Sequence, residues 1–148
     1  MRSRGLGLAS LESGRPARDF DLIGFSLPHE LAASNVLTLL DLAGLPLLAR
    51  ERGEGDSIVV AGGPAVFNPE PLADFLDAVF LGDGEEGAAE MLRLIGQARR
   101  EGLARSEILK RLAQLKGVYV PAFYEPVYEA GRFAGLKVIG PGPKRIGR

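Results

Sequence analysis

The chain has a single histidine, His29, and Glu30 follows it directly. A histidine beside a carboxylate is a common general acid–base pair, and histidine is also a frequent metal ligand. The sequence offers no second histidine and no cysteine for a metal site, and no Ser/His/Asp order surrounds His29. We therefore predict no catalytic and no metal-ligating residue, and expect His29 to contact a ligand. A small self-sufficient enzyme that uses His29 and Glu30 is the least favoured hypothesis.

Two glycine-containing loops are the other candidates for chemistry. Gly62-Gly63-Pro64 follows an apolar run, and paired glycines permit either a tight turn or a close approach to a flat ligand. Both interpretations stay open. Gly82-Asp83-Gly84-Glu85-Glu86 is acidic, so its carboxylates could hold a divalent cation, but a turn and the first turn of a helix are favoured. The Gly62-Gly63-Pro64 turn matches neither the GxGxxG nor the GxxxxGK(S/T) phosphate-binding motif. At the acidic Gly82 loop a phosphate-bearing ligand would meet repulsion unless a metal intervened.

Three short apolar runs, at residues 21–25, 57–61 and 78–81, are rich in β-branched and aromatic residues and do not alternate with polar ones. This pattern is typical of parallel strands that are covered on both faces. Helical patterns at about 28–43 and 68–75 separate them, which predicts an α/β fold with βαβ crossovers. Ligands bind at the carboxyl ends of such strands. The candidate ligand-contact residues are Ser26, His29, Gly62, Gly63, Pro64, Asn68, Gly82, Asp83, Gly84 and Glu85.

The remainder of the chain predicts two helices and an appendage. A helix is expected from Glu85 onward, and another that Ser106 caps and Gly117 closes. Short extended runs then suggest a β-hairpin. We predict an α/β domain at 1–117, a β-hairpin at 118–139 and a linker or tail at 140–148.

The composition excludes several classes of protein. The 148 residues carry a formal net charge of -1, which disfavours a general nucleic-acid binder. Without cysteine the chain holds no disulfide, thiolate zinc site or ordinary iron–sulfur cluster. No secretory signal begins the sequence and its one long apolar stretch is interrupted, so we expect a cytoplasmic protein that does not bind membranes.

Residues 53–92 contain nine acidic residues and no lysine or arginine. Solvated helix faces are the favoured interpretation of this run. The alternative is a stand-alone interaction module whose acidic face, from Glu70 to Glu90, binds a basic partner in a salt-dependent manner.

Several co-linear segments together resemble a known family. They are residues 10–16 (SLESGRP), 19–27 (DFDLIGFSL), 41–48 (DLAGLPLL), 61–71 (AGGPAVFNPEP), 82–86 (GDGEE) and 117–121 (GVYVP). The series resembles the N-terminal domain of an uncharacterised family of radical SAM proteins. That resemblance implies a cobalamin-binding, flavodoxin-like fold, in which Ser26, Gly62, Gly63, Gly82 and Glu85 face a corrinoid or the neighbouring catalytic domain.

Two departures from the family pattern limit what the chain does alone. The CxxxCxxC motif that holds the iron–sulfur cluster and S-adenosylmethionine is absent, so these cofactors belong to a presumed C-terminal domain. The DxHxxG motif that supplies histidine to cobalt is also absent, which leaves cobalamin binding without a protein ligand. We expect an accessory domain that positions cofactor or substrate and docks a radical SAM catalytic domain in cis or in trans. The resemblance also suggests that family members carry an earlier βα unit before the SLESGRP segment, and this unit is missing from the front of the chain. Without it the sheet would lack a central strand and leave an exposed edge, so we expect that edge to pair with a second copy in a homodimer.

Overall fold

A four-stranded sheet forms the centre of the computed structural model, which describes residues 7–82 and 84–146. The strands are β1 (Leu22–Ser26), β2 (Ile58–Gly62), β3 (Ala78–Phe80) and β4 (Val118–Tyr119), in that spatial order. The first three are parallel, and β4 pairs with β3 in the antiparallel direction. The predicted mixed α/β fold with its parallel strands is confirmed, whereas the flavodoxin-like assignment stays a prediction.

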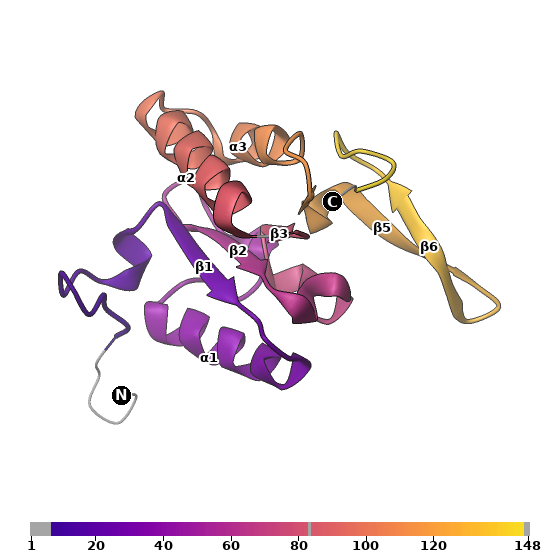
Figure 1. Cartoon of the computed structure of the whole chain (residues 1–148), viewed down its shortest axis with the longest axis horizontal. Helices are drawn as coiled ribbons and strands as arrows, with labels where there is room; N and C mark the ends of the chain where they lie inside the picture. Colours follow the sequence, from indigo (N-terminus) through magenta and orange to yellow (C-terminus); the bar gives the residue numbers. More distant parts are fainter. Residues whose placement is uncertain (1–6, 83, 147–148) are drawn as a thin grey trace.

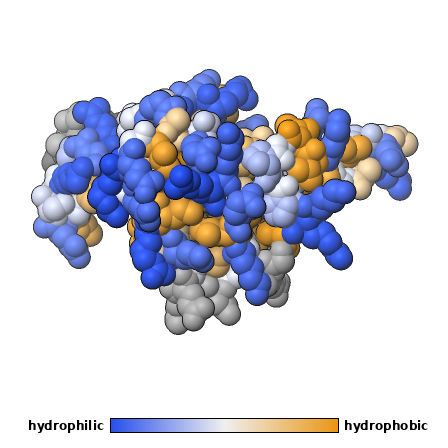
Figure 2. Space-filling view, turned by 90° about the horizontal axis from the view of Figure 1, so that it is seen from above, coloured by the Kyte–Doolittle hydropathy of each residue, from blue (hydrophilic) through white to orange (hydrophobic). Residues whose placement is uncertain are grey.

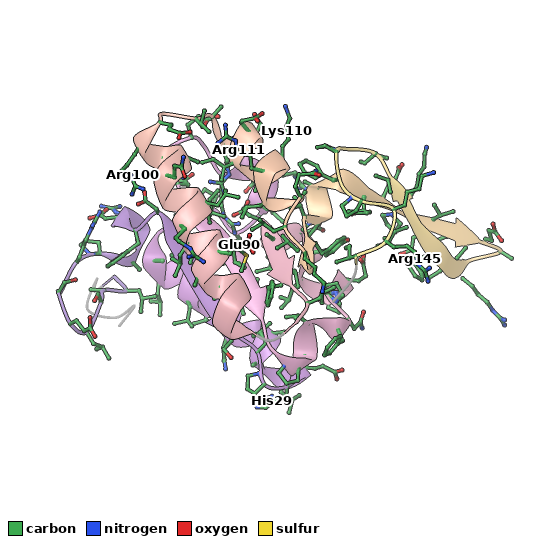
Figure 3. All side chains as sticks on the ribbon, turned by 45° about the horizontal axis from the view of Figure 1, so that its top comes forward. His29, Glu90, Arg100, Lys110, Arg111 and Arg145 are labelled. Carbon is green, nitrogen blue, oxygen red and sulfur yellow. The ribbon has the colours of Figure 1, made fainter. Side chains whose placement is uncertain are left out.

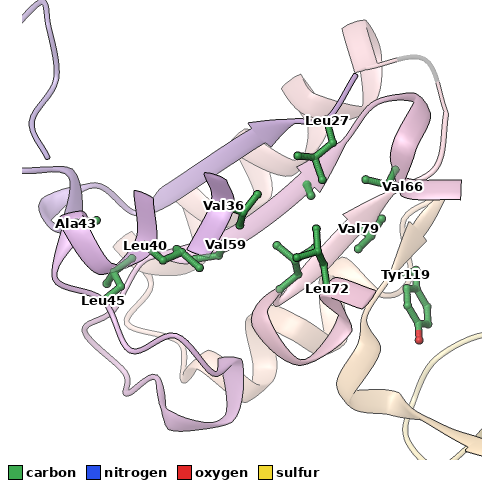
Figure 4. Close-up of a cluster of buried hydrophobic side chains, with 12 residues drawn as sticks. Leu27, Val36, Leu40, Ala43, Leu45, Val59, Val66, Leu72, Val79 and Tyr119 are labelled. Atoms are coloured by element: carbon green, nitrogen blue, oxygen red, sulfur yellow. The ribbon is translucent and has the colours of Figure 1, made fainter. Parts of the chain in front are cut away.

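Helices cover the two faces of the sheet unequally (Figure 1). On one face α1 (Ala33–Ala43) places Val36 and Leu40 against Val59 and Val79 of the strands, in the apolar cluster of Figure 4. On the other face α2 (Gly84–Arg100) and α3 (Arg105–Leu112) pack against Ile58, Val60 and Val118. Burial on both faces explains the uniformly apolar sequences of β2 and β3. The expected cover on both faces is wrong for β1, in which Gly24 and Ser26 are exposed.

The first crossover helix is preceded by a 3-10 turn, Glu30–Ala32, and ends at Gly44 with a φ of 73°. A left-handed residue at this position is the usual end of a helix, and the helical pattern expected to about residue 43 ends there. The segment predicted from Asn68 to Phe75 forms a 3-10 helix, Glu70–Phe75. None of the helices that the structure describes is long and apolar enough to span a membrane.

The predicted Ser106 cap of α3 is wrong. The helix begins one residue earlier, at Arg105, after the N-cap residue Ala104. The Arg105 backbone N–H donates to the Glu54 carboxylate at 2.5 Å, so a side chain from a distant loop satisfies the start of the helix. Local sequence cannot reveal such a partner, because 51 residues separate the two groups.

A separate β-hairpin, β5 (Tyr124–Glu129) and β6 (Arg132–Val138), extends from the main body (Figure 1). The predicted C-terminal hairpin therefore exists, with a tight turn in which Ala130 and Gly131 both have positive φ. Its expected first run, at 118–120, belongs elsewhere: Val118 and Tyr119 form β4 of the main sheet. Their side chains are buried against the body, which is why this run is apolar.

Candidate functional site

A groove of about 400 Å³ runs along β1, from Leu22 at its start to Ser26 at its carboxyl end, on the face that α2 covers. Leu22, Gly24 and Ser26 of β1 form one side, and Met91 and Leu92 of α2 form the other. Gly62, Gly63 and Gly82, which the sequence places after β2 and β3, also line it. The groove exists because α2 packs over β2 and β3 and leaves β1 uncovered on that face. Apolar surface is visible among charged side chains on this face in Figure 2.

A second hollow, of about 530 Å³, continues along the same edge and shares Gly63, Phe80 and Gly82 with the groove. Pro64 lines it, and Glu90 and Lys116 contribute charges of opposite sign. The structure therefore brings Ser26, Gly62, Gly63, Pro64 and Gly82 to one edge of the sheet. An apolar ligand with a polar end fits the lining of these two hollows together.

His29 and Asn68 lie apart from this edge. They line a small cavity of about 50 Å³ on the side of α1, together with Glu30. Figure 3 shows His29 near the start of α1, away from Glu90 on α2. A cavity of this size has room for only a few water molecules. The predicted ligand-contact residues thus divide between two places, and the only histidine of the chain is not among the residues that line the groove.

Three predicted residues belong to the Gly82 loop. Asp83 lies outside the described residues. Gly84 and Glu85 begin α2, as the acidic sequence predicts, and only their backbone is described.

Close packing explains Gly63. Its φ of 104° and ψ of 178° lie in a region that is almost restricted to glycine. A Cβ atom here would stand 2.8 Å from the Leu27 carbonyl oxygen. The loops after β1 and β2 are joined by two backbone bonds, from Leu27 N–H to Gly62 oxygen at 2.8 Å and from Ala65 N–H to Leu27 oxygen at 3.0 Å. The tight-turn interpretation of Gly63 therefore has a physical basis in these contacts.

Sequence reasoning missed a buried ionic cluster at the opposite, amino-terminal edge of the sheet. One Asp77 carboxylate oxygen accepts bonds from Arg52 at 2.9 Å, from Arg105 at 2.7 Å and from the Val59 N–H at 2.7 Å. Asp77 and both arginines are buried. Burial lowers the pKa of the Arg52 guanidinium, and the Asp77 charge opposes this shift. The partners are 25 and 28 residues from Asp77, so no local motif signals the cluster.

Arg52 is further held by backbone carbonyl groups. Its guanidinium donates to Pro46, Leu47 and Phe75 at 2.7–3.1 Å. These bonds use most of the hydrogen-bonding capacity of Arg52, which gives it the partners of a structural residue.

Tyr119 and Glu70 meet beside a third hollow, of about 540 Å³, near the base of the hairpin. The Tyr119 hydroxyl donates to Glu70 Oε1 at 3.1 Å. Burial and the adjacent Glu70 carboxylate raise the pKa of Tyr119 above its ordinary value.

The acidic run at 53–92 does not form a single exposed face over the described residues. Asp77 is buried at the amino-terminal edge of the sheet, Glu70 bonds Tyr119, and Glu90 lines the hollow at the carboxyl edge. Groups of three or more His, Cys, Asp or Glu able to hold a metal ion are also absent among these residues.

Comparison with known proteins identifies the family. Residues 1–121 match the family described as radical SAM proteins, N-terminal. No curated protein and no solved structure matches the chain. The family match spans most of the sequence and includes all three parallel strands, the helices α1, α2 and α3 and every candidate loop. The chain therefore belongs to the family of N-terminal domains of radical SAM proteins.

Proposed function

We propose that this accessory domain holds a substrate or cofactor of a radical SAM reaction at its carboxyl edge and docks the catalytic domain there. The groove beside β1 is the observation that carries the proposal. At one end it gathers Ser26, Gly62, Gly63 and Gly82 from the ends of three strands, which is where parallel α/β sheets bind ligands. Membership of a family of N-terminal domains supports a catalytic partner.

The chemistry is divided between two domains in this proposal. Without cysteine this chain cannot supply the thiolates of an iron–sulfur cluster, so the cluster and S-adenosylmethionine belong to the catalytic domain, in cis or in trans. The residues of the groove bind and orient, and the flanking apolar side chains Leu22, Met91 and Leu92 exclude water.

A corrinoid with a histidine ligand does not fit this arrangement. His29 lines the separate small cavity, and the groove is lined by glycine, serine and apolar residues. Cobalamin is thus proposed only as a ligand held without a protein donor to cobalt, on a flavodoxin-like sheet whose loop glycines let a flat ring approach the backbone.

We expect Gly24→Trp in the native protein to weaken cobalamin binding at least tenfold. A Cβ atom at Gly24 meets only the Leu22 side chain, at 3.7 Å, so the indole ring can occupy the groove without disturbing the sheet. Anaerobic titration followed by absorbance and calorimetry measures the effect. Gly55→Trp is the control, because Gly55 is exposed and has no neighbour within 4 Å of a Cβ position. Absence of any spectral or thermal change with the unmodified protein would remove the corrinoid and leave substrate binding and docking.

The free edge of β1 favours a homodimer as a second mode of assembly. β1 is the first strand of the sheet order and pairs only with β2 among the described residues. The Ile58 N–H donates to the Asp21 oxygen, and the Leu27 N–H donates to the Gly62 oxygen. The backbone groups of Asp21 and Leu27, on either side of β1, therefore point toward β2. By alternation, the backbone groups of Leu22, Gly24 and Ser26 point to the open edge. This edge has no charge, proline or bulge to prevent pairing with another strand.

Two copies paired through β1 are expected to have twice the mass of the 15.8 kDa chain. Gly24→Lys places a charge at the centre of the edge and is expected to raise the dimer dissociation constant at least tenfold, whereas Gly55→Lys is not. Size-exclusion chromatography with light scattering measures both. A monomer of 15.8 kDa at high concentration would exclude the dimer.

A further inference from the structure

The hairpin β5–β6 has one apolar and one charged face. Cross-strand partners lie on the same face, so the register places the pairs Pro126–Leu136 and Tyr128–Phe133 beside Tyr124–Val138 on one face. The opposite face carries the pairs Glu125–Lys137 and Glu129–Arg132, each of opposite charge, on either side of Val127–Gly135, after which the register shifts by one residue. Such an amphipathic pattern indicates that the first face is made to be covered and the second to face water.

The apolar face is covered at its base and bare toward its tip. At the base the Tyr124 ring contacts Tyr119 with centroids 4.9 Å apart, and its hydroxyl donates to the Pro143 carbonyl at 2.8 Å. Toward the tip Tyr128 is 64% exposed, Phe133 56% and Leu136 39%. The hairpin projects from the body in Figure 1, and apolar surface shows along it at the right of Figure 2.

A two-stranded hairpin with a bare apolar face is marginal in water. Here the Tyr128 and Phe133 rings contact only each other edge to face, at 6.2 Å, among the ring contacts of the described residues. Aromatic side chains that protrude from a fixed base have the composition of interface anchors.

We propose that the apolar hairpin face, defined by Tyr128, Phe133 and Leu136, docks on an apolar patch of the radical SAM catalytic domain in the same polypeptide. This inference rests on the proposed function. Two observations select that occupant. The first observation is the place of the hairpin in the chain. The family match ends at residue 121 and β5 begins at Tyr124, so the hairpin directly follows the matched N-terminal domain and lies outside it.

Area is the second observation. Three such side chains at these exposures offer roughly 300 Å² of apolar surface. A stable association of separate copies needs about 800 Å² from each partner. A contact as small as this face is effective when a linker keeps the partner at high local concentration. A tethered catalytic domain therefore fits the hairpin better than a second copy of the chain.

Site-specific photocrosslinking in the native protein, expressed at its natural length in the source cell, tests the inference. The probe p-benzoylphenylalanine replaces Phe133 on the apolar face, Lys137 on the charged face of the same hairpin, or Leu92 at the groove. Leu92 is 55% exposed, so the two main probe positions are equally accessible in the free domain. Mass spectrometry of tryptic adducts identifies the contacted peptides.

We expect position 133 to give at least tenfold more adduct than position 137, on peptides of the domain that carries CxxxCxxC. Adducts with that domain from position 92 and not from 133 would overturn the hairpin inference and keep the proposed function. Adducts with that domain from neither position would overturn both. Adducts from 133 on a second copy of residues 1–148 alone would also overturn the inference, in favour of self-association.

Discussion

Replacing Asp77 with alanine is expected to lower the free energy of unfolding by about 3–5 kcal/mol. The substitution leaves two buried guanidinium groups, of Arg52 and Arg105, without their shared carboxylate. It also leaves the buried Val59 N–H without its acceptor. Removing one member of a buried charge cluster costs far more than removing a surface charge, because the remaining charges stay out of water. Urea denaturation of the unmodified protein and the variant measures the loss, because the denaturation midpoint and the slope m together give the free energy of unfolding.

Asp74→Ala is the matched control for Asp77→Ala. Asp74 is an exposed acidic residue three positions away, and its replacement is expected to change stability by no more than about 0.5 kcal/mol. Equal urea midpoints for the two variants would show that the cluster contributes nothing to stability.

Gly63→Ala is expected to cost about 3 kcal/mol, the second largest effect. Alanine is strained at a φ of 104°, and its Cβ atom would stand 2.8 Å from Leu27 oxygen and 3.1 Å from Leu27 nitrogen. These are backbone atoms, which cannot move aside as the end of a side chain can. The loop after β1 must therefore shift, which disturbs the carboxyl edge as well as stability. Thermal unfolding and the amide NMR shifts of residues 26–28 report the two effects.

The neighbouring Gly62→Ala is the control for this prediction. A Cβ atom at Gly62 meets only Phe80 oxygen, at 3.8 Å, which is ordinary van der Waals contact. We expect a change below about 1 kcal/mol. Similar losses from the two substitutions would mean that strain at Gly63 is absent.

The fold was predictable from sequence where the signal was local. Residues 57–61 and 78–81 predict β2 and β3 because burial on both faces requires uninterrupted apolar residues, whereas residues 21–25 form β1 although part of that strand is exposed. Gly44 predicts the end of α1 because only a residue tolerant of positive φ completes the final turn. Both features depend on residues close together in the chain.

Features that depend on distant partners were not predictable. The Glu54 cap of α3 and the bonds of Asp77 to Arg52 and Arg105 join segments that come together only in the folded sheet. In the candidate site, strand order places Ser26, Gly62 and Gly82 at one edge, as a parallel sheet requires. His29 follows the same strand as Ser26, but the chain turns toward α1 after Leu27, so its side chain lies with Asn68 instead.

The two ends of the sheet differ in what holds them. The amino-terminal end is fixed by Asp77 and its arginines, whereas the groove that runs along β1 to the carboxyl end is lined by glycine, serine and apolar residues. A groove residue such as Leu92, which is half exposed, can be exchanged without disturbing the ionic cluster. This separation makes the domain evolvable. Substitutions in the groove can change which ligand it recognises, and the stability that such substitutions commonly cost is supplied by the ionic cluster at the opposite end.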